Sequence, residues 1–203
     1  FLKATVDVVH KNGGVFIADE VQPGFARTGQ AFFGFARHGI VPDMITMGKP
    51  MGNGIPISGL AAKEDVLAAF SDKLPYFNTF GGNPVSIAAA QAVLKYIKDE
   101  NLQEHCKKAG AALLKALKEV QERHPESVGD VRGAGLFLGF EFVKNDGNKT
   151  PDKDMALNVI EMLRDEHILT SVIGHYGNIL KLRPPMVFSE NDIDWFATSL
   201  DKC

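Results

Sequence analysis

Cysteine is scarce in this chain of 203 residues, and the little there is cannot form a disulfide framework. Only Cys106 and Cys203 occur, and they lack the CxxC spacing of metal-binding or redox motifs. We therefore expect a reducing compartment, the cytoplasm, with the mitochondrial matrix as the alternative. The six histidines occur singly, without an HExxH motif or a Cys/His cluster, so we expect no metal site.

A strong excess of one charge and a long hydrophobic run are also missing. The net charge is −3, and no stretch of Lys and Arg is both dense and one-sided, which argues against nucleic acid and anionic membranes as partners. The apolar runs are far shorter than a membrane span, so the sequence predicts a soluble protein. The chain starts at Phe1 already in a helical apolar pattern, without Met or an N-cap, and we expect a fragment or a processed chain.

The first half of the sequence alternates between short apolar runs and helical patterns. The runs at 15–18 and 43–47 are continuous, which is typical of strands buried on both faces. A helix that ends at Asn12–Gly14 precedes the first run. The other elements expected here are a short helix at 32–39, a strand at 57–62 and a helix at 63–70. This alternation predicts an α/β fold with a mainly parallel sheet.

The second half has a different pattern and predicts a smaller α+β unit. A long helix should start at Pro84, because Asn83 is a good N-cap and proline suits the first helical position. The elements expected after it are helix 101–124, strand 136–143, helix 154–166, strands 168–172 and 178–182, and helix 190–201. We therefore divide the chain into a large domain, 1–99, and a small C-terminal domain, 100–203.

Two familiar phosphate motifs can be rejected. A Walker A loop ending at Lys49 would need glycine where Asp43 stands and Ser or Thr where Pro50 stands. The glycine-rich stretch 133–139 superficially suggests a dinucleotide-binding loop. However, apolar residues alternate along and beyond it, which predicts a strand and not the helix that such a loop would open.

Four features could together hold a small cofactor. Asp19 ends a strand, at the edge where α/β sheets bind ligands, and a carboxylate there needs a cationic partner. Lys49 follows another strand, among glycines that let a flat ligand approach the backbone. Thr79 precedes a helix start whose N–H groups suit a phosphate. Arg183 is followed by two prolines that fix an extended backbone, and its guanidinium could grip a carboxylate.

Each of these residues also has a plainer explanation. Asp19 could cap a turn, Lys49 and Arg183 could be solvated, and the segment at Thr79 could be an ordinary helix cap. Together, however, they make a carboxylate, an amine, a phosphate cradle and a carboxylate clamp. Pyridoxal 5′-phosphate (PLP) needs most of this set, because it has an aldehyde, a ring nitrogen and a phosphate.

Several longer stretches resemble a known family. "IADEVQPGFARTGQAFFGF", "PDMITMGKPMGNGIPISG" and "FNTFGGNPVSIAAAQAVL", in this order and spacing, look like class III (fold type I) PLP-dependent aminotransferases. "GDVRGAGLFLGFEFV" and "LKLRPPMVFS" continue the resemblance, which covers essentially the whole chain and corresponds to about the C-terminal half of such an enzyme. It implies part of the PLP-binding large domain followed by the small α+β domain. Ala26 departs from the common pattern, which has glycine there.

The resemblance implies a role for each matching residue. Lys49 would bind the cofactor covalently and then move the proton at the substrate Cα. Asp19 would keep the ring nitrogen protonated, while Val21 would pack on the ring face and Gln22 would bond the ring hydroxyl. Thr79 would reach the phosphate of the neighbouring subunit's cofactor, which implies a homodimer with shared active sites.

Three hypotheses about function remain. In the first, an amino group moves between an amino acid or amine and a 2-oxo acid, and Arg183 receives the α-carboxylate. In the second, the enzyme is a phospho-lyase on phosphoethanolamine or phosphohydroxylysine, because "GKPMGNG" and "YFNTFGGNPVS" are similar to the alanine–glyoxylate aminotransferase 2-like subgroup, which includes such lyases. In the third, the chain is a non-catalytic fragment, since the family's first phosphate loop and its cofactor-stacking aromatic residue belong to the other half.

Overall fold

The computed structural model describes residues 1–203, apart from the side chain of Ala69. The chain divides into two compact units: unit 1 comprises Phe1–Ala26 and Gln30–Gln103, and unit 2 comprises Arg27–Gly29 and Glu104–Cys203. The main division, after Gln103, falls close to the domain boundary expected after residue 99. That the first unit is the cofactor-binding domain stays a prediction.

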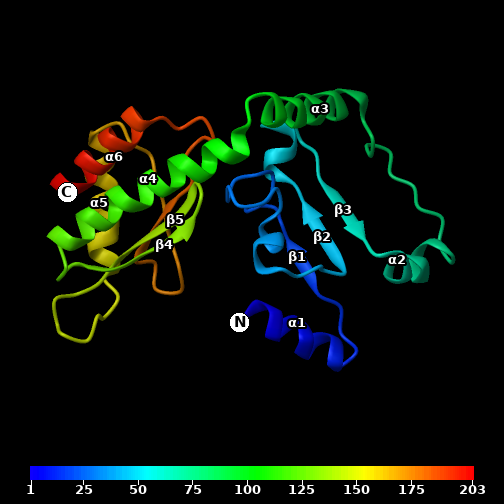
Figure 1. Ribbon diagram of the computed structural model, residues 1–203, viewed down its shortest axis with the longest axis horizontal. Coiled ribbons are helices and arrows are strands. Elements are labelled where there is room, and N and C mark those ends of the chain that lie inside the picture. Colours follow the sequence, from blue (N-terminus) through cyan, green and yellow to red (C-terminus); the bar gives the residue numbers. More distant parts are fainter. The chain divides into compact units, whose positions relative to one another are not determined.

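Unit 1 contains a three-stranded sheet of order β1-β2-β3 (Figure 1). β1 (Ile17–Asp19) runs parallel to β2 (Met44–Met47), as expected, whereas β3 (Gly59–Ala62) runs antiparallel to β2. The helices of this unit are α1 (Leu2–Lys11), α2 (Glu64–Ser71) and α3 (Pro84–Asp99), with the 3-10 helices η1 (Gly34–His38) and η2 (Lys49–Gly52). α3 starts as predicted, because the Asn83 side chain accepts hydrogen bonds from the first turn and Pro84 takes the first helical position.

The prediction that the first two strands are buried on both faces is wrong for the described residues. Val15 is 48% exposed and Ile17 is 51% exposed, and Ala18 alone is buried in β1. All residues of β2 are partly exposed. A continuous apolar run is buried on both faces only where other layers cover both sides of the sheet. The described residues do not cover this sheet in that way.

Unit 2 is an antiparallel sheet of order β4-β5-β7-β6 packed against helices. Its elements are α4 (Leu102–Arg123, which begins in the last two residues of unit 1), β4 (Val128–Ala134), β5 (Phe137–Phe142), α5 (Lys153–Asp165), β6 (Val172–Ile173), β7 (Ile179–Leu182) and α6 (Glu190–Lys202). Buried side chains from α4, α5, α6 and one face of the sheet form a single apolar core. The opposite sheet face carries the alternate, partly exposed residues of β5 and β7.

Two strand predictions in unit 2 need correction. β4 was not expected, because its sequence "VGDVRGA" has few apolar residues and its alternation is interrupted by a bulge between Val128 and Asp130. The strand expected at 168–172 forms only at Val172–Ile173. The rejected dinucleotide loop is the turn between β4 and β5, and the alternating apolar residues after it are buried in the core.

Among the described residues, no helix combines the length and apolar character needed to cross a membrane. The same residues contain no group of three or more His, Cys, Asp or Glu side chains that could hold a metal ion.

Candidate functional site

Only one carboxylate oxygen of Asp19, the last residue of β1, accepts hydrogen bonds from the described part of the chain. Asp19 lies opposite Thr46 of the parallel strand β2. Its Oδ1 accepts hydrogen bonds from Val21 N at 3.1 Å and from Thr46 Oγ1 at 3.3 Å. Its Oδ2 has no hydrogen-bond partner in the described part of the chain, and the residue is exposed. The carboxylate is therefore fixed in place with one oxygen left for a ligand.

Lys49 lies at the same edge of the sheet as Asp19. β1 and β2 are parallel, so both present their carboxyl ends to this edge, where α/β proteins bind ligands. β2 ends at Met47, and Lys49 begins η2 two residues later. Lys49 is exposed, and its amine makes no hydrogen bond or ion pair with any residue that the structure describes.

Val21 lies beside the backbone that leads into Lys49. A Cβ atom placed on Gly48 would be 3.8 Å from both methyl carbons of Val21. The structure therefore brings Asp19, Val21 and Lys49 together at one edge of the sheet, and Gln22 follows Val21 as a half-buried residue. The roles of these residues toward a ligand stay predictions.

Glu20, which the sequence did not single out, holds this edge in shape. It is 2% exposed, its Oε2 accepts a hydrogen bond from Gly34 N and its Oε1 accepts one from Phe35 N, both at 2.7 Å. These bonds tie the start of η1 to the end of β1 and close the loop that carries Val21 and Gln22. The partners lie 14 and 15 residues further along the chain, so no local pattern could identify this role.

The segment before α3 uses most of its N–H groups internally. Phe80 N and Gly81 N donate to Asn78 Oδ1 at 3.1 and 3.0 Å, and Asn83 Oδ1 accepts from two N–H groups of the first turn of α3. These groups cap a turn and a helix, so the expected set of bare N–H groups is not observed. The exposed hydroxyl of Thr79 is the part of the expected phosphate site that remains a prediction.

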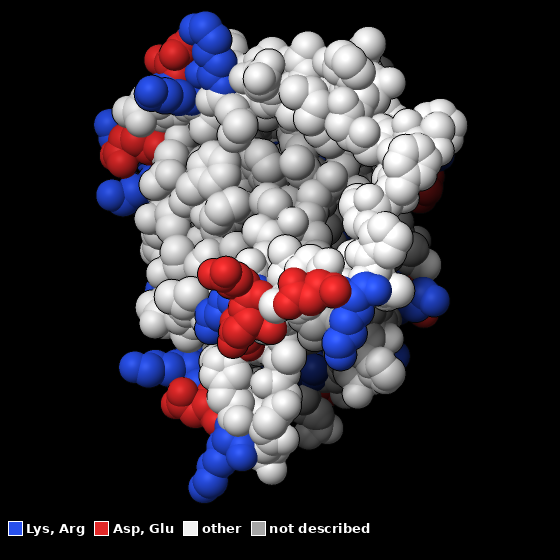
Figure 2. Space-filling model, turned by 90° about the vertical axis from the view of Figure 1, so that its right-hand side faces the viewer, with Lys and Arg blue, Asp and Glu red and all other residues white. Residues whose placement is uncertain are grey.

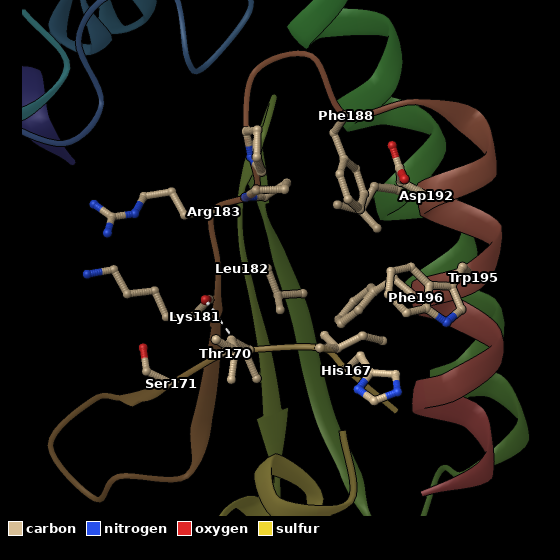
Figure 3. Close-up of a pocket in the computed structure, with 15 residues that line it drawn as sticks. His167, Thr170, Ser171, Lys181, Leu182, Arg183, Phe188, Asp192, Trp195 and Phe196 are labelled. Carbon is tan, nitrogen blue, oxygen red and sulfur yellow. Dashed lines mark hydrogen bonds between the residues drawn. The ribbon is translucent and has the colours of Figure 1, made fainter. Parts of the chain in front are cut away.

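Arg183 belongs to unit 2, directly after β7. Figure 3 shows that Arg183 and Lys181 project from one side of the strand and Leu182 from the other. A cavity of about 440 Å³ lies at this strand end, and its lining includes Leu182, Phe188 and Phe196. The Arg183 guanidinium therefore extends on the side of β7 opposite to the apolar core, where an anionic ligand would not have to enter that core.

Asp43 is the carboxyl group whose pKa is lowered most, and it does not belong to the group formed by Asp19, Val21 and Lys49. Asp43 accepts hydrogen bonds from Lys63 Nζ (2.8 Å), Phe16 N (2.8 Å) and His10 Nε2 (2.7 Å). The bond from Lys63, followed by those from Phe16 and His10, holds the pKa of the Asp43 carboxyl far below its usual range. Asp43, which directly precedes β2, thus joins α1 to the residue before β1 and to the residue after β3, and its role is structural.

Comparison with known proteins assigns the chain to a family. Residues 1–203 match the family described as "Aminotransferase class-III". The chain is 43% identical to "Ethanolamine-phosphate phospho-lyase homolog 1" of Caenorhabditis elegans, with 100% of this chain and 44% of that protein covered. It is 42% identical to "Alanine--glyoxylate aminotransferase 2 homolog 2, mitochondrial" of Arabidopsis thaliana, with 99% and 42% covered.

Solved structures agree with this match. A phospholyase from Arthrobacter in complex with phosphoethanolamine superposes with a TM-score of 0.95 at 38% identity, over 99% of this chain and 47% of that one. An aminotransferase from Bacillus anthracis gives a TM-score of 0.90 at 37% identity, over 99% and 47%. The chain spans less than half the length of these relatives, and the predicted fold type I is confirmed. The chain belongs to the class III aminotransferases, a PLP-dependent family.

Proposed function

We propose that the protein is a PLP-dependent aminotransferase that moves an amino group between an amino acid or amine and a 2-oxo acid. The observation that carries this proposal is the edge of the unit 1 sheet, where Lys49 follows β2 and Asp19 ends the parallel strand β1. An amine and a carboxylate at one sheet edge are what PLP requires of a protein, one for its aldehyde and the other for its ring nitrogen.

The residues at this edge fit PLP. Lys49 has no ion-pair partner in the described part of the chain, so its amine is available to an aldehyde. One oxygen of Asp19 is held by two hydrogen bonds, and the other can accept a hydrogen bond from the N–H of a pyridinium ring. Val21, beside Gly48, offers an apolar surface for the ring face, and Gln22 would bond the ring hydroxyl.

PLP, when bound, supplies an aldehyde that captures an amine and a ring that accepts electrons from the substrate carbon. Lys49 would act as the general base that takes the proton from the Cα of the amino donor. Asp19 would hold its negative charge against the ring nitrogen and so favour the protonated ring. Arg183 would orient the carboxylate of the donor or of the 2-oxo acid through two parallel hydrogen bonds.

A phospho-lyase on phosphoethanolamine or phosphohydroxylysine is the second candidate, because one relative is named a phospho-lyase homolog and one similar structure is a phospholyase with phosphoethanolamine. Lys49 would remove the same proton, and the C–O bond to phosphate would break at the neighbouring carbon, so that phosphate leaves. Water would then hydrolyse the remaining unsaturated amine to an aldehyde and ammonia. Arg183 suits a donor that carries a carboxylate, which amino acids have and phosphoethanolamine lacks.

Two assays of the full-length protein loaded with PLP separate these functions. With L-alanine and glyoxylate, the pair named for an aminotransferase relative, we expect pyruvate and glycine. With phosphoethanolamine and no 2-oxo acid, release of phosphate and ammonia would support the lyase, and its absence would exclude that reaction.

The role of Lys49 can be tested by reducing the PLP-loaded protein with borohydride and mapping the labelled peptide. We expect the pyridoxyl group on Lys49 in the wild type and in the control Lys73→Arg, an exposed lysine of unit 1. Lys49→Arg should carry no label there and should lose activity by at least about 1,000-fold. Label on another lysine would overturn the assignment, and no label at all would favour a non-catalytic fragment.

We further propose a homodimer with shared active sites. Figure 2 shows the side of unit 1 that carries β3, α2 and the segment before α3, and uncharged residues make up most of it. Tyr76, Phe77 and Phe80 are 73%, 84% and 84% exposed, and exposed apolar patches mark interaction surfaces. Thr79 stands among them and would reach the phosphate of the neighbouring subunit's cofactor.

The dimer can be tested by sedimentation of the full-length protein. Phe77→Asp is expected to shift the dimer towards monomer and to weaken PLP binding, because a carboxylate would be buried in the interface. The control Met162→Asp, on the exposed side of α5 in unit 2, should sediment like the wild type. A monomeric wild type would contradict the shared site.

We propose the cytoplasm as the compartment, with the mitochondrial matrix as the alternative. Two relatives carry the word mitochondrial in their names. Imaging of the full-length protein with a C-terminal fluorescent tag distinguishes the two compartments, and a mitochondrial pattern would exclude the first.

A further inference from the structure

The guanidinium of Arg27 donates hydrogen bonds to two backbone carbonyl groups of unit 2. Arg27 Nη1 donates to Pro184 O at 2.8 Å and to Leu136 O at 3.0 Å, while Leu136 N donates back to Arg27 O at 3.0 Å. The side chain is partly buried, and it has no carboxylate partner among the residues that the structure describes. A buried cation without a counter-ion is costly, so its position calls for an explanation other than an ion pair.

Close backbone packing fixes the position of Arg27. Gly29 has a φ of +74°, and a Cβ there would lie 2.6 Å from Lys107 Cα. Gly135 has a φ of +54°, and its Cβ would lie 2.5 Å from Arg27 O. Neither contact leaves room for a side chain, so the short segment Arg27–Gly29 is seated rigidly between α4 and the turn of β4 and β5.

The Pro184 carbonyl belongs to a segment with few other anchors. β7 ends at Leu182, and the following Arg183 lies outside the strand ladder. Pro184 and Pro185 have no backbone N–H and cannot donate to a neighbouring strand. The hydrogen bond from Arg27 therefore holds the peptide group between Pro184 and Pro185, one residue beyond Arg183. Because the ring of Pro184 fixes its φ, this bond also limits the direction in which the Arg183 side chain leaves the backbone.

The charges of the two arginines also interact. Burial lowers the pKa of Arg27, and the positive charge of Arg183 acts in the same direction, although the Cys106 thiol opposes it. Two neighbouring guanidinium groups repel each other, and an anion bound near either of them reduces this repulsion. Because Arg27 is committed to carbonyl groups and Arg183 is exposed, such an anion would bind at Arg183.

We infer that Arg27 is the positioning residue of the carboxylate site: it fixes Arg183 through the Pro184 carbonyl and adds a second positive charge to the field that attracts the substrate. This inference rests on the proposed function. It specifies the substrate class further, as donors that carry an anionic group, and it predicts that Arg27 acts on the affinity for that group more than on the chemical step.

The test compares two amino donors in the PLP-loaded full-length protein: L-alanine, and isopropylamine, which has a methyl group in place of the carboxylate. In Arg27→Met we expect KM for L-alanine to rise about tenfold, with kcat changed by less than about threefold, and a smaller loss for isopropylamine. Arg27→Lys keeps the charge and should recover part of the KM. The control Arg164→Met removes an exposed arginine of α5 and should match the wild type within about twofold.

Binding of propanoate, followed by calorimetry, gives a readout that needs no turnover. Arg27→Met should weaken its Kd by about the same tenfold factor as KM, and Arg27→Lys by less. If the wild type transfers an amino group from neither donor, the proposed function loses its support, and propanoate binding still tests Arg27. Equal losses for both donors, an unchanged propanoate Kd, or no propanoate binding by the wild type would overturn the inference. Arg27→Lys keeps the test open if Arg27→Met does not fold.

Discussion

Unit 1 and unit 2 are stabilised by different kinds of contact. Unit 2 closes around one cluster of buried apolar side chains that runs from Cys106 to Leu200. In unit 1 the buried apolar residues are fewer and more scattered, but both of the buried carboxylates found among the described residues, Glu20 and Asp43, belong to it. Each of these carboxylates accepts hydrogen bonds from backbone N–H groups.

This difference follows from where the candidate site lies. The edge that presents Asp19 and Lys49 is made of strand ends and 3-10 turns, whose N–H groups have no partner in a ladder. Glu20 satisfies two of those groups, so polar contacts fix the geometry of this edge. Asp43 does the same for Phe16 N at the opposite edge, where β1 and β2 begin, whereas packing fixes the sheet of unit 2. Substitutions should therefore affect the two units separately.

The largest expected loss of stability is that of Phe140→Ala, in the core of unit 2. Phe140 is 1% exposed, and its ring centroid lies 5.3 Å from that of Phe142. Removing a buried phenyl ring leaves a cavity and lowers the free energy of unfolding by about 3–5 kcal/mol. Trp195, the single tryptophan of the chain, lies in α6, so its fluorescence during urea titration reports the unfolding of unit 2.

The matched control is Leu169→Ala, because Leu169 is 88% exposed and lies in unit 2, the unit whose unfolding Trp195 reports. The Trp195 transition of this variant should stay within about 0.5 kcal/mol of the wild type. If Phe140→Ala cost no more than the control, the apolar cluster would not be the source of stability in unit 2.

Glu20→Gln is expected to lower the stability of unit 1 by about 1–3 kcal/mol without moving the Trp195 transition. The amide replaces one acceptor oxygen by an NH₂ group that faces the N–H of Gly34 or Phe35, and the remaining bond no longer involves a charge. Hydrogen exchange of the amides in 17–47, followed by mass spectrometry, should become faster. Exchange should be unchanged in the exposed control Glu100→Gln, and unchanged exchange in Glu20→Gln would contradict the role assigned to these bonds.

Elements with local signals are the ones that the sequence predicts well. The start of α3 follows from Asn83 and Pro84, and β5 follows from the alternation of apolar residues along it. The apolar run at 168–172 gave a strand that is mostly absent, because its residues from Ile168 to Ser171 line the cavity beside β7 instead of extending a sheet. A short apolar run does not specify which kind of surface covers it.

In the candidate site, too, some residues can be predicted from local sequence signals and others cannot. Asp19 and Lys49 can be identified from strand ends, because parallel strands bring their carboxyl ends to one edge. Glu20 and Arg27 cannot, since the partners of Glu20 lie 14 and 15 residues away and those of Arg27 lie 109 and 157 residues away. Supporting residues of this kind become visible only when the backbone groups that they bind are located.

A smaller effect, dependent on pH, is expected from Asp43. The hydrogen bond from Lys63, with those from Phe16 and His10, lowers the pKa of this carboxyl, so its contribution is complete above the unfolded value near 3.8 and is lost as the pH falls below it. Lys63 and His10 are 43% and 40% exposed, and water screens their charges. Asp43→Asn should therefore destabilise unit 1 modestly at pH 7.

The pH profile distinguishes this role from simple packing. Thermal unfolding of the wild type, followed by circular dichroism, should lose the Asp43 contribution below about pH 4, and the difference from Asp43→Asn should shrink there. The exposed control Asp7→Asn should follow the wild-type profile. A difference that stays constant down to low pH would indicate packing instead of charge.

The smallest expected effect is that of Ala26→Gly, since two opposing contributions nearly cancel. Ala26 is 0% exposed and has a φ of 68°, in the left-handed region. This conformation costs a residue with a Cβ about 1–2 kcal/mol, whereas losing a buried methyl group costs about 0.8 kcal/mol. The balance predicts a gain below about 1 kcal/mol, measured by urea unfolding followed by circular dichroism.

Ala112→Gly, at an exposed position inside α4, is the control that shows whether backbone strain or methyl packing dominates at Ala26. There the backbone is right-handed, so Ala112→Gly should lose about 0.5–1 kcal/mol. A similar loss in Ala26→Gly would mean that the packing of the methyl group outweighs the backbone strain. It would then follow that the glycine of the common class III pattern is not required by the conformation of this turn, and that even here unit 1 depends on packing as unit 2 does.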